Sequence, residues 1–263
     1  MSEPRRAETT ERFRPADGGV LTAGAVYQDR LQTVLATAVR EEARNVRRAA
    51  EVVATTFSAG GVLYIFGSGH SHMFAEEAFY RAGGAVRVCP VLKAPYMLHE
   101  GAVRSTLLER ETGHAGDVLS GYRLEPDRDC LLVASNSGVN ALPVEVASEA
   151  KAHGLPVIAI TSRAYAGAVQ RPGPRLHDVA DVVIDNHCPP GDALIELADD
   201  LPPTGPASTV VGLALLNSVV VEACAMQLAR GDHPEVFLSA NMPGAAPHNE
   251  KAVAALSARV PHL

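Results

Sequence analysis

Two short stretches of the sequence combine serine, glycine and asparagine in the way that anion-binding loops do. The first is Gly67-Ser68-Gly69-His70-Ser71-His72, and the second is Ser135-Asn136-Ser137-Gly138-Val139-Asn140. Glycine lets the backbone approach an anion closely, and hydroxyl groups donate hydrogen bonds without adding charge. A helix that begins after such a loop adds free N–H groups and the positive end of its dipole. Either loop alone could be an ordinary helix cap, but the two together favour a phosphate ester as ligand.

Neither loop is a common nucleotide-binding loop. GxxxxGK[ST] is absent, and GxGxxG fails because Gly69 is followed by His70, Ser71 and His72. The histidines and acids do not occur at HExxH or another zinc spacing, and no two cysteines form CxxC. We therefore predict neither a metal nor a cofactor.

Acidic and imidazole side chains close to the first loop are candidates for proton transfer. Glu76 and Glu77 fall about one turn into the next helix, where neighbouring residues point about 100° apart, so one of them should face the ligand. The alternative is that this acidic pair only stabilises the helix N-terminus. His70 and His72 could bind substrate or transfer protons near neutral pH, or they could cap the helix.

Other candidates lie farther along the chain. A long segment, 92–129, holds His99 and Glu100 as a second acid/base pair, and a segment this long often contributes to a site. Ser162 follows the fourth expected strand and is a candidate substrate contact. Asp185-Asn186-His187 follows the fifth expected strand. Asn241, together with His248, could close over a bound sugar.

These residues need a framework that brings distant loops together. Short apolar runs alternate with helical segments, and the runs are Val62–Phe66, Val86–Val88, Cys130–Ala134, Val157–Ile160 and Asp181–Ile184. Continuous apolar strands separated by helices predict a parallel sheet that is covered on both faces. We therefore predict an α/β fold, a three-layer doubly wound sandwich with a mostly parallel five-stranded sheet. Ligands of such sheets bind outside the carboxyl ends of the strands, where both loops would lie.

Long helices should flank the sheet. Residues 25–59 contain no glycine or proline and have apolar residues at a helical period, which predicts one long N-terminal helix or a broken pair. Ser208–Arg230 is a second long helix, and its polar Asn217, Ser218 and Glu222 favour a buried helix over a membrane span. Because one domain can hardly bury both helices, we predict a homodimer or a dimer of dimers with the site near a subunit boundary.

The chain is expected to contain one domain, at residues 22–240, between a flexible N-terminal arm, 1–21, and a C-terminal cover segment, 241–263. The net charge is -7 and there is no cluster of Lys or Arg, so nucleic acid is not an expected partner. The polar start of the sequence has no apolar stretch of a secretory signal, and the cysteines have the pattern of reduced core residues. The expected location is the cytoplasm.

The two loops resemble those of the sugar isomerase (SIS) domain, and the similarity covers roughly residues 30 to 240. Met97-Leu98-His99-Glu100-Gly101 and Ser239-Ala240-Asn241 resemble a group of single-domain bacterial SIS proteins. More distant relatives include phosphoheptose isomerases, the isomerase half of glucosamine-6-phosphate synthase and N-acetylmuramic acid 6-phosphate etherase. Regulators of transcription share the domain but add a helix-turn-helix, which the N-terminal region does not resemble. The resemblance implies that the phosphate is bound by Ser68, Ser71, Ser135, Ser137 and Asn140.

The resemblance also implies an enzyme that abstracts a proton from a hexosamine 6-phosphate or its N-acetyl form. Return of the proton to the neighbouring carbon is aldose–ketose isomerisation, whereas loss of the C3 oxygen substituent is a lyase or dehydratase reaction. We favour elimination, because the etherase is a relative and because Lys93, Lys151 and Lys251 all lie outside the phosphate loops. The alternatives are a non-catalytic phosphosugar sensor that binds a partner protein through the N-terminal helix, and a structural subunit with an empty cleft.

Overall fold

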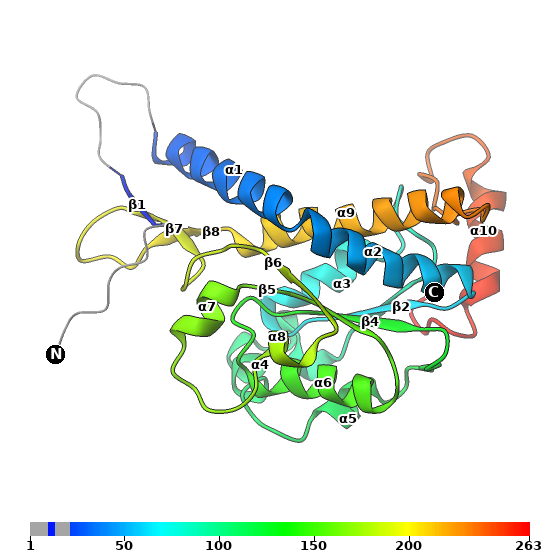
Figure 1. The fold of residues 1–263 in the computed structure, drawn as a ribbon, viewed down its shortest axis with the longest axis horizontal. Coiled ribbons are helices and arrows are strands. Elements are labelled where there is room, and N and C mark those ends of the chain that lie inside the picture. Colours follow the sequence, from blue (N-terminus) through cyan, green and yellow to red (C-terminus); the bar gives the residue numbers. More distant parts are fainter. Residues whose placement is uncertain (1–9, 14–21) are drawn as a thin grey trace.

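The centre of the molecule is a five-stranded parallel sheet with the strand order β3-β2-β4-β5-β6 (Figure 1). The computed structural model describes residues 10–13 and 22–263. The strands are β2 (Leu63–Phe66), β3 (Val88–Val91), β4 (Cys130–Ala134), β5 (Val157–Thr161) and β6 (Val182–Asp185), and all neighbours are parallel. The predicted α/β fold with a five-stranded parallel sheet is therefore confirmed.

The edge strand β3 begins two residues later than the sequence predicts. Val86 donates its backbone N–H to the carbonyl of Glu235, and Ala85 forms a bridge with Val236, so this stretch pairs with the C-terminal part of the chain. The strand then includes Pro90, which is tolerated because β3 lies at the edge of the sheet.

Helices cover both faces of the sheet, since alternate side chains of a strand point to opposite faces. Leu63 and Ile65 belong to one buried core, and Tyr64 and Phe66 belong to the other. The first core packs against α1 (Ala23–Glu41), α2 (Ala43–Ser58), α3 (Met73–Ala78) and α9 (Ser208–Ala229). The second core packs against α5 (Ala115–Leu119), α6 (Ala141–Ala152), α8 (Leu176–Val179) and α10 (Ala245–Leu256).

The long N-terminal helix is a pair that breaks at Glu42, where the backbone leaves the helical conformation. Glu42 is buried, and its carboxylate accepts a hydrogen bond from Asn45 and contacts His187. Among the helices that the structure describes, α9 is the one that is long and apolar enough to cross a membrane. It packs, however, against α1, α2 and α3.

The long segment between β3 and β4 is built from short helices. It contains the 3₁₀ turns η2 (Ala94–Tyr96) and η3 (Leu98–Glu100), the helix α4 (Ala102–Leu108) and α5. Two further short elements, η1 (Gly69–His72) and α7 (Arg163–Ala168), follow β2 and β5 directly. Residues of η1, η3, α4 and α7 lie together around the carboxyl ends of the strands.

Part of the expected N-terminal arm is attached to the domain. The strand β1 (Glu11–Arg12) pairs in parallel with β7 (Ala193–Glu196), and β7 pairs in antiparallel with β8 (Thr204–Pro206). The rest of the arm, 1–9 and 14–21, lies outside the described residues. The sequence did not predict this small sheet, because strands of two to four residues are too short for an alternating pattern to stand out.

The C-terminal segment contains a helix, where the sequence predicts an ordered loop or cover. Pro243, Gly244 and Pro247 are typical of turns, yet Pro247 falls in the first turn of α10, where a helix needs no backbone N–H. Leu256 and Val260 are buried in the second core, so the segment packs on the domain.

The four cysteines are free thiols, of which Cys224 is half-buried and the other three are buried. Burial raises the pKa of both Cys89 and Cys130 to about 12. The thiolate is the reactive form, so we expect iodoacetamide at pH 8 to label Cys224 first in the native protein. Mass spectrometry of timed digests measures this, and equally fast labelling of Cys89 or Cys130 would contradict it.

Candidate functional site

A cleft of about 520 Å³ lies at the carboxyl edge of the sheet. The chain passes from β2 to β3 on one side of β2 and then to β4 on the other, so the loops after β2 and β4 diverge there. Such a switch point is where open α/β sheets bind ligands. The cleft wall includes all seven predicted phosphate-binding residues, namely Ser68, His70, Ser71, Ser135, Asn136, Ser137 and Asn140.

Close backbone packing shapes both loops. In the first loop Ser71 donates its N–H to the carbonyl of Ser68 over 3.0 Å, and a Cβ on Gly67 would lie 2.2 Å from the carbonyl oxygen of Ser71. In the second loop Gly138 has φ +61, and a Cβ there would lie 2.6 Å from Oγ1 of Thr161. Glycine is therefore required at both positions for the turns to close.

Gly67→Ala is expected to disrupt the first loop, because the clashing atom belongs to the backbone and cannot rotate away. We expect a loss of about 1–3 kcal/mol in the free energy of unfolding. Urea denaturation measures this effect. Gly116→Ala, in α5 with open space around it, is the matched control, and equal behaviour of the two variants would refute the prediction.

The carboxylate of Glu109 bridges the two loops. Its Oε2 accepts a hydrogen bond from Oγ of Ser68 over 2.9 Å, and its Oε1 accepts one from Nδ2 of Asn140 over 2.7 Å. Glu109 is the C-cap residue of α4, so the long segment after β3 delivers it to the cleft. Nη1 of Arg171 donates to Oδ1 of Asn140 over 3.0 Å and extends the network to the loop after α7.

Asp192 is the other carboxylate of the described cleft wall, and it has a structural task. It accepts hydrogen bonds from the backbone N–H groups of Ala207 and Ser208 and from the hydroxyl of Ser208, at the start of α9. Its hydrogen-bonding capacity is therefore used at a helix N-terminus. Glu109 remains the carboxylate of the described cleft wall that contacts both loops.

Sequence reasoning did not select Glu109 as a candidate. The residue lies 41 positions after Ser68 and 31 positions before Asn140, and it belongs to no motif with either loop. One available signal was the length of the segment that contains it, which indicates a contribution to a site.

Of the predicted acid/base residues, His70 lies in the described wall of this cleft, and the other five lie outside it, namely His72, Glu76, Glu77, His99 and Glu100. Glu77 accepts a hydrogen bond from Asn217 of α9 over 3.1 Å and also pairs with Arg81. Nε2 of His72 lies 3.4 Å from the carboxylate of Glu76. The His72 ring contacts the ring of His99, which lies beside Glu100, at 6.3 Å between centroids. His72, Glu76, His99 and Glu100 thus form a cluster behind the first loop. A catalytic role for these four residues and for Glu77 stays a prediction.

The two other substrate candidates are also placed away from the cleft wall. Ser162 is fully buried, and its Oγ donates to the carbonyl of Cys188 and accepts from the N–H of Tyr165 as the N-cap of α7. Asn241 is exposed in the turn before α10. His248 contacts the carbonyl of Val236 in the same region.

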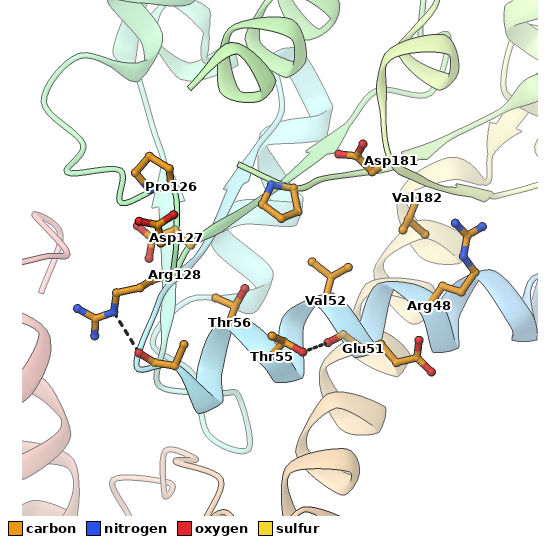
Figure 2. Close-up of a pocket in the computed structure, with 13 residues that line it drawn as sticks. Arg48, Glu51, Val52, Thr55, Thr56, Pro126, Asp127, Arg128, Asp181 and Val182 are labelled. Carbon is orange, nitrogen blue, oxygen red and sulfur yellow. Dashed lines mark hydrogen bonds between the residues drawn. The ribbon is translucent and has the colours of Figure 1, made fainter. Parts of the chain in front are cut away.

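A second hollow, of about 480 Å³, lies at the opposite edge of the sheet between α2 and the starts of β4, β5 and β6 (Figure 2). Arg128 donates to the carbonyls of Ala59 and Gly60, and Asp181 pairs with Lys151. This hollow contains no glycine-rich loop ahead of a helix, so we place the site at the carboxyl edge. Within the described ranges, no group of three or more His, Cys, Asp or Glu could hold a metal ion.

Comparison with known proteins places the chain in a family. Residues 26–162 match the model of the SIS domain. A UPF0309 protein of Geobacillus thermodenitrificans is 41% identical over 240 residues, which cover 90% of this chain and 96% of that protein. A UPF0309 protein of Brucella canis is 43% identical over 221 residues, or 84% of this chain and 90% of the relative.

Among solved structures, a protein of Silicibacter pomeroyi assigned as a phosphosugar isomerase has a similar fold. It superposes with a TM-score of 0.50 at 17% sequence identity, over 78% of this chain and 51% of that chain. The sequence matches and the fold agree with each other, and this chain belongs to the UPF0309 family of SIS-domain proteins.

Proposed function

We propose that this protein is an enzyme that binds a phosphosugar in the cleft at the carboxyl edge and abstracts a proton from it. The observation that carries the proposal is the convergence of two hydroxyl-bearing loops on one cleft with the carboxylate of Glu109 between them. Hydroxyl, amide and backbone donors can bind the phosphate, and the carboxylate can take the proton.

The cleft offers several features that favour an anion. The second loop leads into α6, a helix of 12 residues whose N-terminus adds free N–H groups. Arg110 and Arg171 also lie in the wall, and the hydrogen bonds that they donate go to the carbonyls of Thr106 and Arg110 and to the amide oxygen of Asn140. Nδ2 of Asn136 is buried and has no hydrogen-bond partner within residues 10–13 and 22–263. Ser68 and Asn140 donate to Glu109, so the phosphate would meet the remaining donors first.

We further propose a hexosamine 6-phosphate or its N-acetyl form as substrate and elimination as the reaction. Glu109 would take the proton from the carbon next to the carbonyl, and the resulting electron pair would expel the C3 oxygen substituent. An acid such as His70 would protonate the leaving oxygen, which departs as water when the substituent is a hydroxyl. None of the three lysines lines the cleft, which disfavours lysine-assisted ring opening.

An incubation with glucosamine 6-phosphate and N-acetylglucosamine 6-phosphate in D₂O, followed by NMR, tests this function. Isomerisation would produce ketose signals, and elimination would remove the C3 proton environment and release the substituent. Exchange of the C2 proton would report proton abstraction in either case. The proposal would be refuted if neither sugar phosphate binds to the protein or reacts.

A non-catalytic phosphosugar sensor is the second candidate, and an apolar surface favours it. A groove of about 570 Å³ runs between the α1–α2 pair and α9, and Val39, Val46, Leu215 and Val221 lie along it. Val39 is 50% exposed and Val221 is 68% exposed. A sensor would bind the phosphosugar without any exchange of the C2 proton, so the same NMR experiment separates the two candidates.

For the enzyme, we propose that a second copy of this chain, in place of a different partner protein, covers the same groove and gives a homodimer or a dimer of dimers. Val221→Glu is then expected to shift the protein to a monomer in light scattering, because an unpaired charge would be buried in the interface. Val103→Glu, at an exposed position on α4, is the control and should leave the mass unchanged. A monomeric wild-type protein at micromolar concentration would contradict the proposal.

The reduced thiols and a phosphorylated substrate favour the cytoplasm as the place of action. We propose the small phosphosugar as the ligand, in preference to nucleic acid or a membrane surface, because the net charge is -7.

A further inference from the structure

We propose that Asn186, which lies behind the cleft wall, is a positioning residue that holds Nδ2 of Asn136 ready to donate to an oxygen of the bound phosphate. The inference rests on the proposed function in one respect, the identity of the group that enters the cleft. Asn186 follows β6, is only 2% exposed and is not part of the described cleft wall. It would act on the ligand through Asn136.

A backbone donor determines the orientation of both amides. The N–H of Cys188 donates to Oδ1 of Asn186 over 3.0 Å, and a backbone N–H can only donate. Nδ2 of Asn186 must therefore face the other way, and it donates to Oδ1 of Asn136 over 2.9 Å. The N–H of Asn186 also donates to the carbonyl of Thr161, which fixes the residue in place. This chain of bonds leaves Asn136 with its oxygen used and its nitrogen free.

The free nitrogen is an unusual feature for a folded protein. Nδ2 of Asn136 is buried and has no partner among the described residues, and an unpaired buried donor is unfavourable. The backbone carbonyl of Asn136 already accepts from the N–H of Ser162 and from Oγ1 of Thr161. Since Asn136 lies in the cleft wall between Ser135 and Ser137, the missing acceptor is best supplied by a ligand oxygen.

Asn186→Asp tests the inference because it replaces the amide donor that faces Asn136 with an acceptor oxygen. The introduced carboxylate can still accept from Cys188, but it presents an oxygen to Asn136. The Asn136 amide should then rotate so that Nδ2 faces the carboxylate and Oδ1 faces the ligand. We expect the affinity for phosphate to fall by about 100-fold, against about tenfold for Asn136→Ala, which only removes one bond to a charged group.

The experiment is calorimetry on the full chain with inorganic phosphate, N-acetylglucosamine 6-phosphate and unphosphorylated N-acetylglucosamine. Asn249→Asp is the matched control, because the Asn249 side chain also makes two hydrogen bonds, to the backbone of Leu238, away from the cleft. We expect Asn186→Asp to weaken the binding of inorganic phosphate and of N-acetylglucosamine 6-phosphate, and to leave the binding of unphosphorylated N-acetylglucosamine unchanged. If that variant does not fold, Asn186→Ala leaves the Asn136 amide unrestrained and should weaken phosphate binding about threefold to tenfold.

The double variant distinguishes positioning from general damage. If Asn186 acts through Asn136, then Asn186→Ala, which adds no charge near the phosphate, should cost no further phosphate affinity once Asn136 is alanine. Wild-type affinity in Asn186→Asp, or an equal loss from Asn186→Ala on both backgrounds, would overturn the inference while leaving the proposed function standing. Failure of the wild-type protein to bind any phosphorylated ligand would instead refute the proposed function together with the inference.

Discussion

Glu109→Gln is expected to lower the turnover of the phosphosugar by about 10³-fold while the protein still binds its ligand. Glutamine keeps the shape of the side chain but cannot accept the proton. Loss of a general base typically lowers the rate by about 10²–10⁴-fold. Removal of the negative charge beside the phosphate should leave the affinity equal or tighter. Rates from NMR and dissociation constants from calorimetry provide the two measurements.

Glu111→Gln is the matched control for this change. Glu111 lies two residues beyond Glu109 on the surface, where its carboxylate contacts His114. Glu77→Gln addresses the competing assignment, since Glu77 is the predicted base that the structure pairs with Arg81 and Asn217. Full turnover in Glu109→Gln, combined with inactivity in Glu77→Gln, would transfer the role to Glu77.

Asp129→Ala is expected to lower the free energy of unfolding by about 3–5 kcal/mol, the usual effect of removing one partner of a buried ion pair. The side chain of Asp129 is fully buried. Its Oδ2 accepts from Arg259 over 2.6 Å and from the N–H of Glu125 over 2.7 Å, and its Oδ1 accepts from the N–H of Val62 over 2.8 Å. The alanine variant would leave all three donors without this acceptor.

Chemical denaturation with urea measures the loss. Asp127→Ala, two residues away at an exposed position, should change the stability by less than about 0.5 kcal/mol. Asp129→Asn keeps the shape and one acceptor, so it should fall between the two. A loss below about 1 kcal/mol for Asp129→Ala would show that the ion pair only compensates its own desolvation.

The framework of the fold could be predicted because local patterns encode it. Strands β2, β4 and β5 are buried along their whole length, so they stand out as continuous apolar runs. The phosphate loops follow two of these strands directly. Because the strands are parallel, the loops must lie at the same carboxyl ends of the strands. All seven residues that were predicted to bind phosphate do line one cleft.

The remainder depends on contacts between distant positions, which no local pattern records. Glu109 and Asn186 join the site through side-chain bonds across 31 to 50 residues. Helical geometry predicts that one of Glu76 and Glu77 faces the ligand, but contacts with α9 and His72 decide where these side chains go. The helix α10 was missed because Gly244, just before it, and Pro247, in its first turn, are typical of turns, and burial of Leu256 stabilises it nonetheless.

The position of Pro90 in the outermost strand has a consequence for behaviour at high concentration. Proline lacks the backbone donor that an incoming strand would need, and natural proteins use this residue at sheet edges to prevent growth of the sheet between molecules. Crowding or storage should therefore not produce fibrils that start from β3.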